Sequence, residues 1–322
     1  MLPDPGLDAR IAVGLGQVEV LLRESVVSEY PFVTNAARHL VDAGGKRFRP
    51  LLTLLAAQFG DPAFAEVTSS AVVVELTHLA TLYHDDVMDE ASLRRGADSA
   101  NARWDNTVAI LTGDFLFARA SDLLADLGPD AVRIQARTFE RLCTGQIRET
   151  VGPAEGEDPI GHHVSVLADK TGSLIATAGR FGAMMSGAPD ETVETLATFG
   201  ERIGVAFQLA DDLVDIGSEH SQSGKTPGTD LREGVPTLPS LYARRSLAPD
   251  DARLVALLSS KVAEEDVEET LDLLRAHPAL DESRREVRRW ADLAREELLS
   301  LPDTPARDAL LQICDSVVTR TT

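Results

Sequence analysis

Two short stretches of the sequence each carry three aspartates with the pattern Asp-Asp-x-x-Asp, and both follow long apolar segments. On a helix, positions i and i+4 project from the same face, so each stretch would present two carboxylates one turn apart. Carboxylates beside a core repel one another and resist desolvation unless a cation lies between them. The pattern therefore predicts a divalent cation site, and Mg²⁺ is the cation usually held by one or two carboxylates together with substrate phosphates. The six residues are Asp85, Asp86, Asp89, Asp211, Asp212 and Asp215.

Basic residues lie near both acidic stretches. "GGKRFRP" at 44–50 precedes a predicted helix, whose first backbone N–H groups also favour anions. "LRRG" follows the first acidic stretch, "ADKTGSL" lies between the two, and a lysine follows the second. Any one of these side chains alone would be a solvated surface charge, as one acidic stretch alone would be a solvated helix end. Together they predict a polyphosphate held through metal ions and a second anion bound directly by guanidinium and ammonium groups.

The elements that must position these groups are helices. Between Gly- and Pro-containing breaks lie segments of roughly 12 to 30 residues, rich in Ala, Leu, Val, Arg and Glu, with apolar residues at helical spacing. Alternation typical of strands is nearly absent. No change in composition marks a boundary, so we expect an all-α protein with a single domain over residues 1–322.

Composition excludes several classes of function. The 322 residues carry a formal net charge of −21, which argues against nucleic-acid binding because a phosphate backbone needs a basic surface. No signal peptide is evident, and no run of about 18 apolar residues predicts a membrane span. The only cysteines, Cys143 and Cys314, have no metal-ligand or redox spacing. We expect a cytoplasmic protein.

These motifs resemble the trans-isoprenyl diphosphate synthases of the polyprenyl synthetase family, and among them the long-chain all-trans polyprenyl diphosphate synthases. The resemblance covers most of the chain and rests on "GGKRFRP", "LYHDDVMDEASLRRG", "GDFLFARA", "KTGSLIATA", "FQLADDLVDIGS" and "GKTPGTDLREGVPTLP". It implies the isoprenoid synthase fold, a single helical bundle around a central active-site cavity, and usually a homodimer. It also implies that an allylic diphosphate (geranyl, farnesyl or geranylgeranyl) ionises and is attacked by the double bond of isopentenyl diphosphate.

The resemblance also implies roles for individual residues. The six aspartates and Lys170 would be catalytic, with the aspartates arranging three Mg²⁺ ions. The allylic diphosphate would contact Arg94, Lys170, Thr171, Gln208 and Lys225. Isopentenyl diphosphate would contact Lys46, Arg49, His78 and Arg95. One departure concerns Val235, which stands where many members of the family carry a lysine; Arg232 is a candidate replacement.

Small residues upstream of Asp85 predict a long product. Short-chain members of the family place aromatic rings four and five positions before this aspartate, where this chain has Thr81 and Ala80. We therefore expect an apolar tunnel and a product of roughly C35 to C45, most plausibly a quinone side chain, with a C20 to C25 product as the alternative. Such a product would seek a membrane, so transient contact with a bilayer is also expected.

Three rival interpretations stay open at this point. A class I terpene cyclase would also ionise a diphosphate, but its second metal motif normally carries Asn, Ser and Glu. An HD-type metal phosphohydrolase would use His84-Asp85 with His39 or His78, and would leave the second acidic stretch unexplained. A non-catalytic subunit of a two-component synthase would typically lack intact aspartate motifs.

Overall fold

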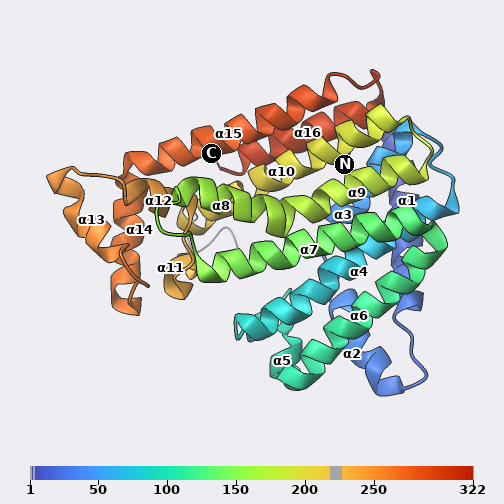
Figure 1. Cartoon of the computed structure of the whole chain (residues 1–322), viewed down its shortest axis with the longest axis horizontal. Helices are drawn as coiled ribbons and strands as arrows, with labels where there is room; N and C mark the ends of the chain where they lie inside the picture. The colour runs from blue at the N-terminus through green and yellow to red at the C-terminus, as the bar shows by residue number, and fades with distance from the viewer. Residues whose placement is uncertain (1, 3, 218–226, 322) are drawn as a thin grey trace. The chain divides into compact units, whose positions relative to one another are not determined.

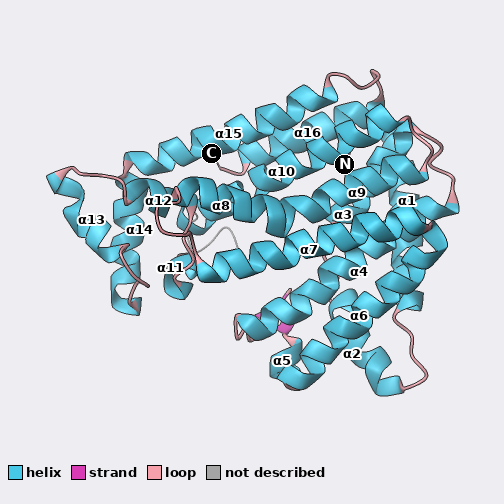
Figure 2. Cartoon of the chain, viewed as in Figure 1, coloured by secondary structure: helices cyan, strands magenta, loops and turns pink. Residues whose placement is uncertain are grey.

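The computed structural model describes residues 2, 4–217 and 227–321 and is almost entirely helical, which confirms the all-α prediction (Figures 1 and 2). The chain divides into two compact units, which we describe separately. Unit 1 comprises Met1–Phe139, Leu174–Ala197 and Leu301–Ala309, and unit 2 comprises Glu140–Ser173, Thr198–Ser300 and Leu310–Thr322. That both act as one domain stays a prediction.

Unit 1 carries the first acidic stretch and "GGKRFRP". Three long helices, α7 (Pro129–Val151), α10 (Asp190–Gly217) and α16 (Pro305–Thr319), contribute residues to both units. The remaining elements of unit 1 are α1 (Pro5–Ser25), α2 (Pro31–Asp42), α3 (Phe48–Ala56), a 3-10 turn at Ala57–Phe59, α4 (Ala65–Met88), α5 (Ala100–Arg103), α6 (Asn106–Leu127) and α9 (Ser173–Met185).

Helix α4 is the centre of unit 1 because it is apolar on nearly every side. It packs against α1, α3 and α6, and it lies side by side with α6 in Figure 1. Glycine permits the closest approach, since a Cβ at Gly113 of α6 would lie 2.4 Å from His84 Nε2. A helix that is hydrophobic on all sides is expected inside a core, and α4 thereby brings its acidic C-terminal end to a defined place in unit 1.

A short hairpin follows α4 and gives the two arginines of "LRRG" different places: Arg94 is in a strand and Arg95 is in the turn. Strands β1 (Leu93–Arg94) and β2 (Ala97–Asp98) pair antiparallel, with Arg94 opposite Ala97. Arg95 and Gly96 form the turn with φ values of +54° and +80°. Positive φ at both central residues is the type I′ geometry that suits a tight hairpin, and it favours glycine. Figure 2 shows this strand pair beside α5.

Unit 2 carries the second acidic stretch. Its further helices are α8 (Pro159–Leu167), a π-helical turn at Ala168–Gly172, α11 (Thr229–Glu233), α12 (Leu238–Ala243), α13 (Ala252–Leu257), α14 (Val267–Ala276) and α15 (Pro278–Leu298), with 3-10 turns at Pro249–Asp251 and Glu264–Asp266. Helix α15 is amphipathic: Val287, Ala291, Ala294 and Leu298 are buried at helical spacing, and the helix packs on α12.

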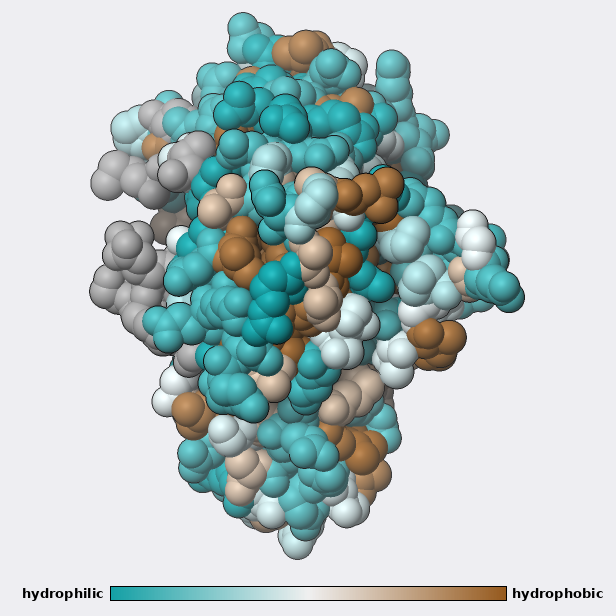
Figure 3. All heavy atoms as spheres, turned by 90° about the vertical axis from the view of Figure 1, so that its left-hand side faces the viewer, coloured by the Kyte–Doolittle hydropathy of each residue, from teal (hydrophilic) through white to brown (hydrophobic). Residues whose placement is uncertain are grey.

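The surface is polar. Figure 3 shows one face on which hydrophilic residues predominate and hydrophobic residues form small separate groups, as expected for a strongly charged chain. None of the described helices combines the length and the apolar character that crossing a bilayer requires.

Candidate active site

The first acidic stretch lies at the C-terminal end of α4, where Asp89 is the C-cap. The last carbonyl groups of a helix carry partial negative charge, so carboxylates at this end raise the local negative potential and favour a cation. Asp85 is half-buried and Asp89 is exposed. The one-turn spacing of these two carboxylates on α4 is therefore as the sequence predicted, and their role as metal ligands stays a prediction.

Asp86 has a different environment from its two neighbours. It is fully buried, and Oδ1 accepts a hydrogen bond of 2.6 Å from Arg94 Nε. Its Oδ2 is buried and has no hydrogen-bond partner among the described residues. Burial raises the pKa of Asp86, and the Arg94 guanidinium opposes that rise. A metal ion at Asp86 would have to reach this buried Oδ2 or replace Arg94.

The predicted ligands of isopentenyl diphosphate belong to unit 1. We call Lys46, Arg49, His78 and Arg95 the basic cluster. Arg95 Nη1 donates to the carbonyl of Gly44, and a Cβ at Gly45 would lie 2.8 Å from Arg95 Cζ. The two glycines, with φ of +79° and +142°, therefore let the arginine lie against the loop backbone.

The positive charges of the basic cluster act on one another. Burial and then the charge of Arg95 lower the pKa of Arg49 to about 10, against the opposing effect of Glu75. The Nε atom of Arg49 is buried and lacks a hydrogen-bond partner among the residues described. Burial, followed by nearby guanidinium groups, holds the pKa of His78 well below 6.5. Desolvated positive charge with an unsatisfied donor is what an anion-binding pocket without its anion would present.

The second acidic stretch lies near the C-terminal end of α10, and each carboxylate has a protein partner. Asp211 Oδ1 accepts a hydrogen bond of 2.7 Å from Arg320. Asp212 is buried, and its Oδ2 accepts from His163 Nε2 at 2.9 Å and from the Leu238 backbone N–H at 3.0 Å. These partners come from α8, α12 and the end of α16.

Asp215 caps a short helix. Its two oxygens accept the backbone N–H groups of Thr229 and Asp230 at 3.1 and 3.2 Å, at the start of α11. A carboxylate is favoured at this end of a helix because the first N–H groups lack intrahelical partners. Through these two bonds, the start of α11 is held against the C-terminal part of α10.

Lys170 and Thr171 lie in the π-helical turn between α8 and α9. Lys170 Nζ is 2.6 Å from Glu149 Oε2, and a Cβ at Gly145 would lie 2.6 Å from the Lys170 backbone nitrogen, so α7 approaches this turn closely. Single π-turns occur often at functional sites. Gln208 is half-buried on α10, one turn before the aspartates. Lys225 lies outside the described residues.

Arg232, the candidate replacement for the missing lysine, has protein partners of its own, and its role stays a prediction. The Arg232 guanidinium binds Glu264 at 2.8 and 3.1 Å and donates to the carbonyl of Pro227 at 2.6 Å. Val235 instead lines a cavity with His163, Val166 and Leu241. The side chain that stands in the lysine's place thus lines a cavity of mixed character, which Glu149 and Arg244 also line.

The chain-length residues differ in exposure. Ala80 is fully buried, whereas Thr81 is half-buried and its hydroxyl donates to the carbonyl of His78 at 2.8 Å. At about 100° per residue, Thr81 lies about 40° around α4 from Asp85, and Ala80 about 140°. Thr81 is the better placed of the two to meet a chain that starts at Asp85.

The donor set fits Mg²⁺ only in part. Within residues 2, 4–217 and 227–321, no three His, Cys, Asp or Glu side chains converge as a ready-made metal site. Mg²⁺ commonly keeps waters and takes its other ligands from substrate phosphates. Asp85 and Asp89, at the negative end of α4 with the unsatisfied Oδ2 of Asp86 nearby in sequence, fit an ion that arrives with a diphosphate.

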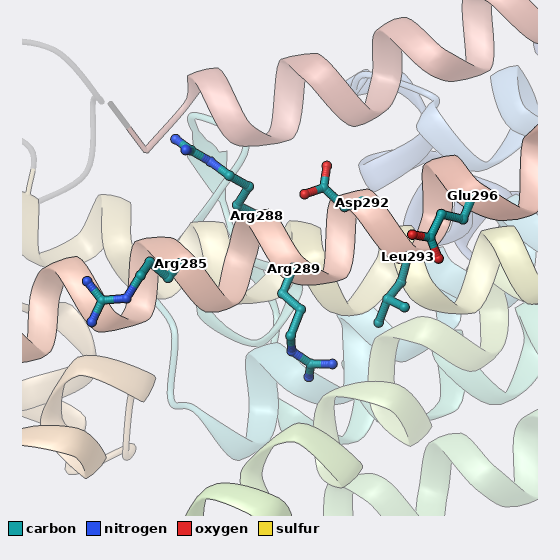
Figure 4. A pocket seen from close by; sticks show the side chains of 6 residues that line it. All are labelled: Arg285, Arg288, Arg289, Asp292, Leu293 and Glu296. Carbon is teal, nitrogen blue, oxygen red and sulfur yellow. The ribbon is translucent and has the colours of Figure 1, made fainter.

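A further hollow, on the surface of α15, holds none of the predicted residues. Figure 4 shows Arg288 and Asp292 on one side of the helix and Arg289 and Leu293 on the other. Arg289 already forms a hydrogen-bonded ion pair with Glu286, at 2.5 and 2.9 Å. Mixed charges along one exposed helix are those of a solvated surface.

Several partners in these sites could not be found from the sequence motifs. They include His163, Arg320, Glu149 and, next to the basic cluster, Glu75. Each is separated from its partner by at least 21 residues, and none belongs to a motif with a spacing of its own.

His39, a candidate metal ligand in the phosphohydrolase alternative, has other contacts. Its Nε2 is 2.7 Å from the Asp98 carbonyl oxygen, and its Nδ1 is 3.0 Å from Arg103.

Comparisons with known proteins agree with the motifs. The polyprenyl synthetase family model matches residues 30–274. Nonaprenyl diphosphate synthase of Mycobacterium tuberculosis is 52% identical, covering 99% of this chain and 96% of its own length. Dimethylallyltranstransferase of the same organism is 42% identical, covering 98% of this chain and 97% of its own length. The crystal structure of geranylgeranyl pyrophosphate synthase from Corynebacterium glutamicum, complexed with calcium and isoprenyl diphosphate, matches with a TM-score of 0.90 at 48% identity, covering 100% of this chain and 99% of that chain.

The electrostatics of the basic cluster predict a ligand-dependent pKa at His78. Without ligand, its imidazole should titrate below 6.5, and inorganic diphosphate should raise that pKa because the anion offsets the guanidinium charges. By linkage, a lowered folded-state pKa means that the unfolded chain binds the proton first. His78 then contributes stability that is complete above about pH 6.5 and is lost as the pH falls. NMR titration, with His78→Gln to assign the resonance, measures the shift; an unchanged pKa with diphosphate would contradict the anion pocket.

Proposed function

Because the chain belongs to the polyprenyl synthetase family, we propose that it is a trans-prenyltransferase that condenses isopentenyl diphosphate repeatedly with an allylic diphosphate. The observation that carries the proposal lies in unit 1. One helix, α4, ends in the carboxylates that attract a cation, and two to three turns earlier it carries His78 of the basic cluster. Cation-seeking and anion-seeking groups on one helix suit two diphosphates bound in different ways, one through metal and one directly.

In the proposed reaction, the allylic C–O bond breaks and its electron pair leaves with the diphosphate. The double bond of isopentenyl diphosphate forms the new C–C bond to the allylic carbon, and a proton is then lost to the displaced diphosphate. When bound by the six aspartates, the ions (we propose three Mg²⁺) would stabilise the charge that develops on the leaving group. The basic cluster would hold isopentenyl diphosphate in place. The allylic diphosphate would be held by Lys170, Arg94, Thr171, Gln208 and Lys225.

Two contacts in the structure bear on that assignment. Arg94 is bound to Asp86, and Lys170 is bound to Glu149. Both side chains would have to exchange a carboxylate for a diphosphate or share it with one. A diphosphate carries more negative charge and more acceptor oxygens than one carboxylate, so it can compete for both cations. The proposal therefore includes a rearrangement of these two side chains when the allylic substrate binds.

We propose a product of roughly C35 to C45, for a quinone side chain, with transient membrane contact on its release. Small residues at Ala80 and Thr81 support a long tunnel, and the relative of highest identity given above is named for a nonaprenyl product. The solved structure at 48% identity is named for a geranylgeranyl product, so a C20 to C25 product is the alternative.

The first experiment is an assay of the purified chain alone with farnesyl diphosphate, isopentenyl diphosphate and Mg²⁺. We expect elongation that EDTA abolishes and that Asp85→Ala lowers about 100-fold or more in kcat, the size of losing one preorganised electrostatic group. Products are identified by chromatography. Turnover of the allylic substrate without isopentenyl diphosphate would favour a terpene cyclase. No elongation by the isolated chain would favour a subunit that needs a partner.

The same assay tests the tunnel. Thr81→Phe should shorten the product, because a ring one turn from Asp85 would block the path along α4. Ala80→Phe should also shorten it but lower the Tm, because Ala80 is fully buried and a large ring there strains the core. An unchanged product distribution in a Thr81→Phe enzyme with wild-type Tm would mean that the chain takes another route.

We also propose a homodimer, because α6 and the adjoining part of α7 expose apolar side chains. On α6, Leu111 is 61% exposed and its neighbour Ile110 43%, and Val132 of α7 is 44% exposed. Leu111→Glu should convert a dimer to a monomer in sedimentation, since a buried unpaired charge is strongly destabilising. Val13→Glu, at an equally exposed position of α1, is the matched control. Dimers of equal stability in all three proteins would exclude this face.

A further inference from the structure

The middle arginine of "GGKRFRP" is buried between two glutamates. Arg47 Nε donates to Glu19 of α1 at 2.5 Å, and Nη1 donates to Glu75 of α4 at 2.8 Å. The Arg47 side chain is 6% exposed and that of Glu75 2%. A guanidinium is removed from water at this depth only with paired, hydrogen-bonded charges around it.

All five N–H donors of Arg47 are used within the protein. Besides those two bonds, Nη1 donates to the Gly44 carbonyl at 3.3 Å, and Nη2 donates to the Val41 carbonyl at 2.9 Å and to Glu19 Oε2 at 3.4 Å. A guanidinium has five donors and no acceptor. Arg47 therefore has no donor left for a diphosphate, whereas the nearby Arg49 keeps its buried Nε without a partner among the described residues.

The backbone at Arg47 determines where its neighbours point. Arg47 is the N-cap of α3 and has a φ of +46°, in the left-handed region that a non-glycine residue avoids. Anchors on α1, on α4 and at the end of α2 hold it there. Lys46 precedes this residue and Arg49 follows it in the first turn of α3, so their directions depend on this backbone conformation.

Glu75 connects the same network to the rest of the basic cluster. It lies three residues before His78 on α4, so the two share a helix face. Its charge opposes the lowering of the pKa at Arg49 and at Arg95. Glu75 is thus a buried counter-charge for guanidinium groups that otherwise repel one another.

We propose that Glu19, Arg47 and Glu75 are positioning residues: they hold the basic cluster in the arrangement that binds isopentenyl diphosphate and do not touch the substrate. This inference rests on the proposed function. A positioning role differs from a purely electrostatic role of the glutamates in the sign of the change in anion affinity when a glutamate is removed. If the glutamates acted only through charge, removing one would strengthen binding of an anion; if they position the cluster, removing one weakens it.

Glu19→Ala is the decisive variant, because Glu19 is the more exposed glutamate and its loss leaves the Arg47–Glu75 pair in place. We expect the KM for isopentenyl diphosphate to rise about 10-fold or more, the usual cost of losing a group that orients a ligand. The KM for the allylic substrate and the kcat should change less than about twofold. Glu19→Gln, which keeps an acceptor for Arg47 Nε, should fall between the variant and wild type.

Arg23→Ala is the matched control. Arg23 also joins α1 to α2, through a 3.1 Å pair with Asp42, but both side chains are about half exposed. Its KM values should match those of wild type. A KM for isopentenyl diphosphate that is unchanged or lower in Glu19→Ala, or an equal rise in Arg23→Ala, would overturn the proposal.

A binding measurement separates this inference from the proposed function. Calorimetry with inorganic diphosphate, without Mg²⁺, needs no turnover and reports on the basic cluster directly. Weaker binding in Glu19→Ala and Arg47→Lys, at unchanged Tm for the former, would support positioning even if no elongation were found. Equal or tighter binding in Glu19→Ala would overturn the positioning role even in an active synthase.

Discussion

Charges of one sign that are gathered away from water need counter-charges, and this constraint organises unit 1. Arg47, Arg49 and Arg95 surround the middle of α4, where Glu75 is the buried acidic residue that offsets them. At the end of the same helix the sign reverses, and Asp86 is neutralised by Arg94. In buried ion pairs such as Arg47–Glu75, each charge is compensated by a group of the protein itself. Buried polar atoms that the fold does not satisfy, such as Arg49 Nε and Asp86 Oδ2, are the ones that a ligand could satisfy.

Unit 2 meets the same constraint with different chemistry. Its three aspartates are balanced by a guanidinium, an imidazole and backbone N–H groups in turn. The first of these partners, Arg320, lies just after α16 and packs on the Phe207 ring, and its pair with Asp211 is about one third exposed. Asp212 and Asp215 instead contact α8, α11 and α12. The second stretch thus combines one partly exposed ion pair with two contacts that connect helices.

Much of this could be predicted from the sequence, because helix periodicity and i, i+4 spacing are local properties. The all-α class and the placement of Asp85 and Asp89 one turn apart followed from them. The buried pair of Asp86 and Arg94 did not, because Arg94 lies outside α4, in β1. Arg47 appeared equal to Lys46 and Arg49 in sequence, since both of its carboxylate partners are 28 residues away. Pairing across such separations depends on how helices pack, which no short pattern records.

The π-helical turn at Ala168–Gly172 interrupts the regular α-helical geometry directly after α8. A π-turn accommodates one residue more than an α-turn, so side chains after it are rotated by about 100° relative to an uninterrupted α-helix. His163, before the turn, points to Asp212, and Lys170, within it, points to Glu149. The number of residues in this segment is therefore as much a determinant of the site as their identity.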